Sequence, residues 1–371
     1  MKTRCENLRS VLRGEAPAWV PFCPNFNQWF VHHQKFGTLP PELRGCRDYL
    51  DAMKVLGCDI FSRNLPSGFT ERDTKWQRKV TVREEALGKE KTMVYETPFG
   101  ALRQVTQDQN AISSAHVVEY LVKDWGRDGD AFRAFMEQRE FDWDEEAFLK
   151  THRRVGDDGI LNVAVGSTPL KFLHTYFGLD HSCLFVMDHP EAAKEVCDLY
   201  WSRLRPVLLR VASHPEVESA ILMDNVDTPF YPPSLAVEYW APYVKEAVEI
   251  MGRHGKPLFV HACGKLKGLA RLFAETRVSG LEGISHPPLG DWTAAEAQAC
   301  HPGFIFIGGF SAREQEMAGD ATVREFYREY LGAARKERFI FASSCQTAVQ
   351  TSWERLKLVR EICREWGGEM P

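Results

Sequence analysis

The chain has 371 residues, of which 44% are hydrophobic and 26% are charged, and its formal net charge is −5. These fractions are those of an ordinary globular protein, and the acidic balance excludes a general nucleic-acid binder, which needs a basic surface. The N-terminal segment has no apolar core of signal-peptide length, and the later apolar runs are too short to cross a bilayer. We therefore expect a cytoplasmic protein with no membrane segment and no nucleic-acid partner.

The ten cysteines are scattered along the chain and suggest no disulfide framework. In a reducing compartment most of them are expected to be small buried hydrophobic residues, and a few to be ligands. Composition does not show which cysteines are buried and which are ligands, so we use their positions in the predicted fold to separate the two groups.

The first part of the chain predicts two strands and a β-rich insertion. Apolar runs at residues 20–23 and 59–62 are typical of buried strands, and residues 48–56 between them have helical periodicity. Residues 79–123 instead alternate β-branched and polar residues, punctuated by glycine and proline, which indicates an inserted β-hairpin excursion. Helices are predicted after the insertion at residues 128–138 and 144–154.

Further along the chain, short apolar runs alternate with amphipathic helical segments. Strands are predicted at residues 160–165, 220–223, 257–261, 280–284, 304–307 and 339–342. The helical segments lie at residues 192–212, 235–253, 266–276, 323–336 and 352–366. With the first two runs this makes eight strands, the number that closes a barrel whose parallel strands are buried on both faces. We predict an α/β protein, a single (β/α)8 TIM-barrel domain over residues 1–371 with the insertion at 79–123; a doubly wound open sheet is the alternative.

Residues with metal-binding side chains stand at the ends of the predicted strands, where barrel enzymes place their active sites. His261 and Cys263 are two residues apart on the fifth strand, so both side chains project to the same side. Cys345 follows the eighth strand, and the three would meet across the barrel mouth. Two such residues also occur together in ordinary cores, but thiolates and an imidazole from several elements form a ligand set for zinc. The helix predicted after Cys345 would favour its thiolate through the N-terminal dipole.

The segments around these residues resemble the uroporphyrinogen decarboxylase superfamily, and specifically its zinc-dependent methyltransferase branch. The resemblance is carried by FVHACGKLKGL around His261 and FASSCQT around Cys345, and it extends to ENLRSVLRGEAPAWVP and LGCDIF near the N-terminus. Proteins of that branch carry His-x-Cys-Gly on strand five and a lone cysteine after strand eight, and they work with corrinoid proteins. The resemblance therefore implies a Zn²⁺ site at His261, Cys263 and Cys345 and a corrinoid (cobalamin) carried by a partner protein.

The zinc site is also similar to that of cobalamin-independent methionine synthase, in which a glutamate of the next strand is a further ligand. Glu282 on the predicted sixth strand matches it, with an inward glutamate held by an ion pair as the alternative. Asp224, at the end of strand four, matches an acid that holds the substrate amine in that relative; the alternative is a loop-capping aspartate. We expect Asp224 and His286 to be catalytic, with His286 donating to a substrate carboxylate or phenolate, or serving a structural role instead.

Two missing motifs narrow the function that the resemblance implies. The decarboxylases carry an arginine-rich signature after strand one, where this chain reads PFCPNFNQWF, so a porphyrinogen substrate is not expected. The chain contains no Asp-x-His-x-x-Gly motif for cobalamin binding, so the corrinoid would arrive on a separate carrier protein.

Aromatic residues near the ends of strands one and four bear on the substrate. If they line the pocket, they favour a methoxylated aromatic compound over a small thiol; ordinary packing is the alternative. We expect the substrate to be bound by Phe26, Trp29, Asn225 and Tyr231.

The sequence and the resemblance together predict an enzyme. It would be a zinc-dependent methyltransferase that moves a methyl group from a small methoxylated substrate to the Co(I) corrinoid of a carrier protein, as the O-demethylation component of anaerobic one-carbon metabolism. Three alternatives remain open: methylcorrinoid-to-thiol transfer, a uroporphyrinogen decarboxylase-like lyase without zinc, and a barrel that only binds a tetrapyrrole. A homodimer is compatible with the sequence.

Overall fold

Eight parallel strands form one sheet in the order β1-β14-β13-β12-β11-β10-β9-β2. The computed structural model describes residues 2–72, 80–109, 114–311, 319–332 and 334–368. The N–H of Asp59, just before β2, donates to the carbonyl of Phe22 in β1 at 2.9 Å, so the two ends of the sheet meet. The predicted (β/α)8 barrel is confirmed. The doubly wound alternative is wrong, because its strand order would reverse at a switch point.

The barrel strands are short and almost fully buried, as parallel strands covered on both faces should be. Each overlaps the run that was predicted for it. Their bounds are β1 Phe22–Cys23, β2 Ile60–Ser62, β9 Gly159–Ala164, β10 Ser219–Val226, β11 Leu258–Ala262, β12 Gly280–Ile284, β13 Ile305–Phe310 and β14 Phe339–Ser343.

Helix α1 (Arg4–Arg13) closes the amino-terminal end of the barrel. Its buried residues Cys5, Leu8 and Val11 pack against the side chains that fill the barrel interior. Those interior side chains are Cys23, Phe61, Ile160, Ile221, Phe259, Ile305, Ile307, Ile340 and Ala342. With the amino-terminal end covered, the carboxyl ends of the strands form the mouth, as in other barrels of this type.

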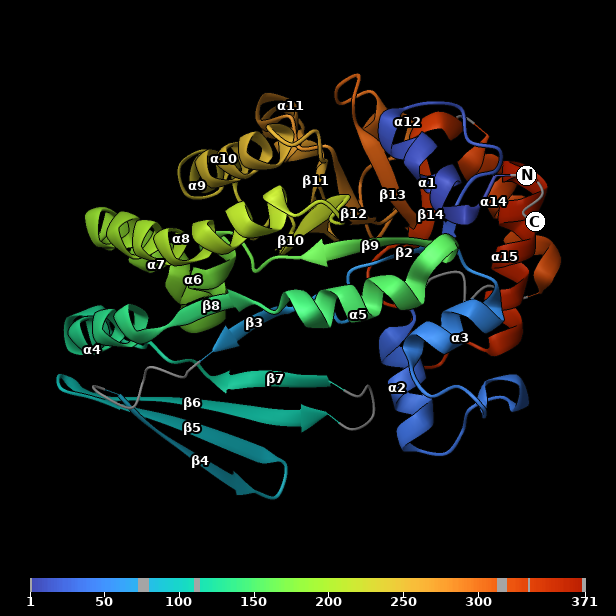
Figure 1. The fold of residues 1–371 in the computed structure, drawn as a ribbon. Coiled ribbons are helices and arrows are strands. Elements are labelled where there is room, and N and C mark those ends of the chain that lie inside the picture. The colour runs from blue at the N-terminus through green and yellow to red at the C-terminus, as the bar shows by residue number, and fades with distance from the viewer. Residues whose placement is uncertain (1, 73–79, 110–113, 312–318, 333, 369–371) are drawn as a thin grey trace.

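Helices cover the outside of the barrel (Figure 1). They are α2 Asn27–Lys35, α3 Tyr49–Leu56, α5 Glu145–Val155, α6 Pro169–Phe177, α7 Leu179–Asp188, α8 Pro190–Ser213, α9 Pro233–Tyr239, α10 Ala241–Gly252, α11 Ala270–Thr276, α12 Ala294–Gln298, α14 Asp320–Leu331 and α15 Trp353–Gly367. The single helix predicted at residues 235–253 is in fact two, because Pro242 has no N–H to continue the helix past Trp240. Residue 333 of the predicted helix 323–336 lies outside the described residues. In the described part of the chain, no helix combines the length and apolarity needed to cross a membrane.

Two antiparallel sheets are built from strands that lie between β2 and β9 in the chain. Strands β4 (Thr81–Leu87), β5 (Glu90–Thr97), β6 (Gly100–Gln109) and β7 (Ser114–Glu119) form a sheet in chain order, against which α4 (Trp125–Gln138) packs (Figure 1). A separate antiparallel pair, β3 (Phe69–Arg72) with β8 (Glu140–Trp143), lies outside residues 79–123. These four-residue strands are too short to give a clear alternation in the sequence. Lys79 and residues 110–113 of the predicted insertion lie outside the described residues.

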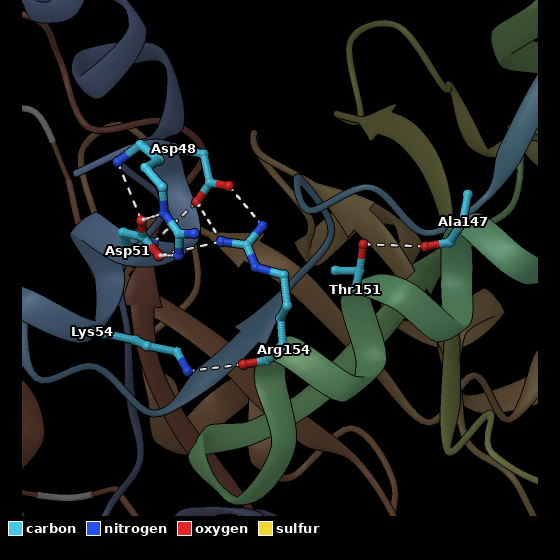
Figure 2. A network of polar contacts seen from close by, with 7 residues as sticks. Asp48, Asp51, Lys54, Ala147, Thr151 and Arg154 are labelled. Carbon is cyan, nitrogen blue, oxygen red and sulfur yellow. Dashed lines mark hydrogen bonds and ion pairs between the residues drawn. The ribbon is translucent and has the colours of Figure 1, made fainter.

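An ion-pair network fastens the helix before β2 to the helix before β9 (Figure 2). Arg154 of α5 donates to both carboxylate oxygens of Asp48, at 2.7 and 3.0 Å, and to Asp51 at 3.2 Å. Lys54 of α3 donates back to the Arg154 carbonyl at 2.8 Å. The side-chain hydrogen bond from Arg47 lowers the pKa of Asp51 to about 2. The network thus joins the helices that flank two neighbouring barrel strands.

Replacing Arg154 by alanine is expected to lower the free energy of unfolding by about 1 kcal/mol, because the pairs are partly exposed and screened by water. The pKa values of Asp48 and Asp51 are lowered, so this contribution is complete above about pH 4 and is lost as the pH falls toward 2. Urea denaturation near neutral pH and again near pH 3 measures the difference. The exposed neighbour Arg153, replaced by alanine, is the control. An equal loss at both pH values would contradict the ion-pair explanation.

Candidate metal centre

Strand β11 directs two metal-binding side chains into the barrel mouth. Successive residues of a strand point to opposite faces, so Phe259, His261 and Cys263 share one side. Phe259 belongs to the interior of the barrel, whereas Val260 and Ala262 pack in the outer core beneath the helices. His261 and Cys263 therefore face inward at the end of the strand, as the sequence predicts.

Cys345 completes a group of three. It follows β14, and its Sγ lies 3.6 Å from Nε2 of His261. The ligand atoms of His261, Cys263 and Cys345 all lie within 4.8 Å of one another. His261 is buried and both cysteines are half-buried. Two sulfurs and an imidazole nitrogen at this spacing fit a tetrahedral metal such as zinc, so the group could bind one.

Glu282 lies on the other side of the imidazole. It is the register partner of His261 across β11 and β12, and its Oε2 is 2.5 Å from Nδ1 of His261. The same oxygen accepts a hydrogen bond from Nε of Arg63 at 2.8 Å. The structure thus places Glu282 against the nitrogen that faces away from Cys345, and not within the group of three. A carboxylate here fixes the imidazole tautomer and leaves Nε2 for coordination.

Neighbouring charges distinguish the two cysteines. The hydrogen bond from Cys263, the imidazole of His261 and the cation of Arg63 lower the pKa of Cys345 well below its usual range. The hydrogen bond with Cys345 and burial raise the pKa of Cys263. The expected helix dipole does not contribute at close range, because α15 begins only at Trp353 and the Ser352 side chain caps it. The guanidinium of Arg63, together with the imidazole of His261, takes the place of the helix dipole in favouring the Cys345 thiolate.

A glycine lets the strands approach the imidazole closely. Gly283 of β12 has φ +97 and sits where the register with β13 shifts. A Cβ at this position would lie 2.5 Å from the Ser344 carbonyl oxygen and 2.7 Å from Cε1 of His261. Only a residue without a side chain fits this space.

Asn25, which follows β1, braces the loop that carries Cys345. Its Nδ2 donates to the Cys345 carbonyl at 2.7 Å, and its own N–H donates to Oγ of Ser343 at 2.9 Å. Asn64, which follows Arg63 in the sequence, donates from its Nδ2 to Oδ1 of Asn25 at 2.5 Å. The amide therefore links the ends of β1, β2 and β14 around the metal-binding group. No pattern in the sequence predicts the roles of Asn25 and Arg63.

The family model described as uroporphyrinogen decarboxylase (URO-D) matches residues 177–366, just over half of the chain. The match includes β11, β12 and β14, and with them His261, Cys263, Glu282 and Cys345. The chain belongs to the URO-D family. No curated protein matches it at the sequence level.

Two solved structures are similar to this chain at low identity. A methyltransferase from Methanosarcina mazei is similar over 98% of this chain and 99% of its own, with a TM-score of 0.64 and 12% identity. A B12-independent methionine synthase from Shewanella sp. W3-18-1 covers 94% of each chain with a TM-score of 0.46 and 11% identity. The first likeness shows that the two proteins share a fold over nearly the full length of the chain.

In this URO-D protein, Asp224 is fully buried and its oxygens are occupied. It accepts hydrogen bonds from the Thr168 N–H at 2.8 Å, from the Thr168 hydroxyl at 2.7 Å and from Nε1 of Trp240 at 2.9 Å. Burial raises its pKa, although these bonds oppose the rise. Asp224 thus ties β10 to the start of α6 and to the α9–α10 junction. The adjacent Asn225 is exposed, and its amide can pair with Lys171.

His286 is fully buried and does not belong to the group of three. Its Nε2 lies 3.0 Å from the Ser311 hydroxyl, and its Nδ1 lies 2.8 Å from the Pro287 carbonyl. Its ring packs against Phe326 and Tyr330 of α14. These contacts are those of a structural histidine, and the catalytic roles of Asp224 and His286 stay predictions.

The aromatic residues proposed for the substrate lie in packed surroundings. Phe26 contacts Tyr49, while Trp29 stacks on Trp353 and donates to the Thr351 carbonyl at 2.8 Å. Tyr231 is buried edge-on against His174. Phe230, an aromatic residue in the loop between β10 and α9, is 41% exposed. The contacts of Phe26 and Trp29 are thus those of ordinary packing, and their role in substrate binding remains a prediction.

Proposed function

We propose that this protein is a zinc-dependent methyltransferase. It would move a methyl group from a small methoxylated substrate, preferably aromatic, to the Co(I) corrinoid of a separate carrier protein. The observation that carries the proposal is the grouping of His261, Cys263 and Cys345 at the mouth of a URO-D-family barrel. Three protein donors leave one position of a tetrahedral zinc for a substrate atom, which is the arrangement of catalytic zinc sites.

The reaction breaks the methyl C–O bond of the substrate. The electron pair of that bond stays on oxygen, which then takes a proton from water, and the methyl group bonds to the carrier's cobalt through an electron pair that Co(I) supplies. A bound Zn²⁺ would supply Lewis acidity that makes the ether oxygen a better leaving group. His261, Cys263 and Cys345 would hold the ion, while Glu282 fixes the His261 tautomer from behind.

Three further observations support this choice among URO-D-like activities. The M. mazei protein, which has the same barrel along nearly its whole length, is named a methyltransferase. The segment PFCPNFNQWF, which includes β1 and the start of α2, contains no arginine, and Arg63 at the end of β2 is bonded to Glu282. These two segments therefore offer no unpaired arginine to bind the carboxylates of a porphyrinogen. The half-exposed Phe230 supports an aromatic substrate beside the mouth.

Co(I) cobalamin, supplied to the zinc-replete protein with a panel of methoxybenzoates and methoxyphenols, tests the proposal. The expected result is conversion to the methylcobalamin spectrum with at least one donor, abolished by Cys345→Ser. If methylcobalamin instead methylates small thiols and no ether reacts, the protein is the thiol-directed methyltransferase. No transfer in either direction refutes the proposal, and decarboxylation of a porphyrinogen would establish the lyase.

A further inference from the structure

We propose that Arg63 is a positioning residue that holds Glu282 on the imidazole of His261 and so keeps the carboxylate out of the metal's fourth position. This inference rests on the metal site of the proposed function and specifies which protein groups bind the metal. Without this restraint Glu282 would take the fourth position, and a substrate atom would have to displace it.

The contacts that carry the inference converge on one oxygen atom. Oε2 of Glu282 accepts from Nε of Arg63 at 2.8 Å and lies 2.5 Å from Nδ1 of His261. The sulfur of Cys345 lies on the other side of the same ring, 3.6 Å from Nε2. A metal held between that nitrogen and the sulfur is therefore separated from Glu282 by the width of the imidazole.

The burial of the pair explains why an arginine is needed. The Arg63 and Glu282 side chains are only 8% and 9% exposed, and that of His261 is 2% exposed. A buried carboxylate without a cation is strongly unfavourable, so it pairs with whichever positive charge it can reach. With Arg63 present, that charge is the guanidinium. Without Arg63, the remaining cation would be the metal itself on the far side of the imidazole, and the carboxylate would gain by moving toward it.

The sequence neighbours of Arg63 hold it in place. It follows β2 directly, and Asn64 beside it donates to Asn25, whose amide in turn bonds the Cys345 carbonyl. The guanidinium therefore approaches Glu282 from the β2 side, across the mouth from β12. The same chain of contacts fixes the loop of Cys345, so the carboxylate and the thiol are positioned together.

The visible spectrum of the cobalt(II)-substituted protein tests this arrangement. Imidazole is the probe because it is neutral when unprotonated, so the loss of a cation does not by itself weaken its binding. In the wild-type protein, imidazole is expected to change the cobalt bands by entering the open position. In Arg63→Met, Glu282 is expected to occupy that position, and the midpoint of the imidazole titration should rise at least about tenfold. The double variant Arg63→Met/Glu282→Gln should regain the wild-type response.

Two further variants separate positioning from folding. Arg63→Lys keeps the charge and is expected to keep the imidazole response, with thermal unfolding of each metal-free protein as the check on folding. Glu282→Gln alone should bind zinc about 10- to 100-fold more weakly, as second-shell changes do, yet still respond to imidazole. The inference is overturned if folded Arg63→Met responds to imidazole as the wild type does. It is also overturned if the wild-type protein shows no response to imidazole. Because this readout is spectroscopic, a protein that fails to transfer methyl groups can still pass it.

Discussion

Cys345→Ser is expected to abolish stable metal binding, and with it methyl transfer. A serine hydroxyl stays protonated where the Cys345 thiol has a lowered pKa, so one of three donors is lost. The zinc dissociation constant should rise by more than the roughly 100-fold that is typical of second-shell changes. Metal content after dialysis should fall from about one ion per chain to near zero, and Cys263→Ser should behave alike.

The fold is expected to survive this change. Asn25 bonds the backbone carbonyl of residue 345, which serine retains, so the loop keeps its brace. Cys46 provides a matched control, since it is also a half-buried free thiol but lies before α3. Cys46→Ser should keep full metal content. Competition with a chromophoric chelator measures the affinities, and a Cys345→Ser protein that still binds zinc as tightly as the wild type would remove the basis of the proposed function.

The parts of the site that the sequence could predict depend on strand periodicity. The alternation of side chains along a strand places His261 and Cys263 on one side of β11, independently of the loop conformations. In a (β/α)8 barrel the carboxyl ends of all strands lie at one mouth, so the end of β14 lies at the same mouth as that of β11. Each of these inferences needs only the strand assignment. The eight apolar runs supply that assignment, since buried parallel strands read as short runs of Val, Ile and Phe.

The missed residues lacked such a signal. Arg63 also stands at a strand end, but a lone arginine has no characteristic spacing, and its partner is far away in the sequence at position 282. The sequence predicts the strand that carries Glu282, but periodicity does not say which nitrogen of His261 the carboxylate meets. Phe26 and Trp29 fit a lined pocket and a packed core equally well, and only their contacts with α15 separate the two.

Gly283→Ala is expected to damage the metal centre from a position that offers no ligand. The new Cβ would lie 2.5 Å from the Ser344 oxygen and 2.7 Å from His261, so the imidazole and the Cys345 loop must both shift. Overpacking and backbone strain at φ +97 together should cost about 1–3 kcal/mol of folding free energy. Because all three donors must stay within bonding distance of one ion, the zinc affinity should also fall, by about tenfold or more.

Two other glycines separate strain from collision. Gly37 and Gly100 have φ +66 and +130, on either side of the Gly283 value, and neither has an atom within 4 Å of a built Cβ. Alanine at either position should lower stability through strain alone and leave zinc affinity unchanged. Denaturation of the metal-free proteins gives the strain, and chelator competition gives the affinity. Gly283→Ala could instead lower the zinc affinity no more than these controls do. In that case the close packing of β12 against His261 would not be what positions the imidazole, and the backbone hydrogen bonds of β11 would be what positions it.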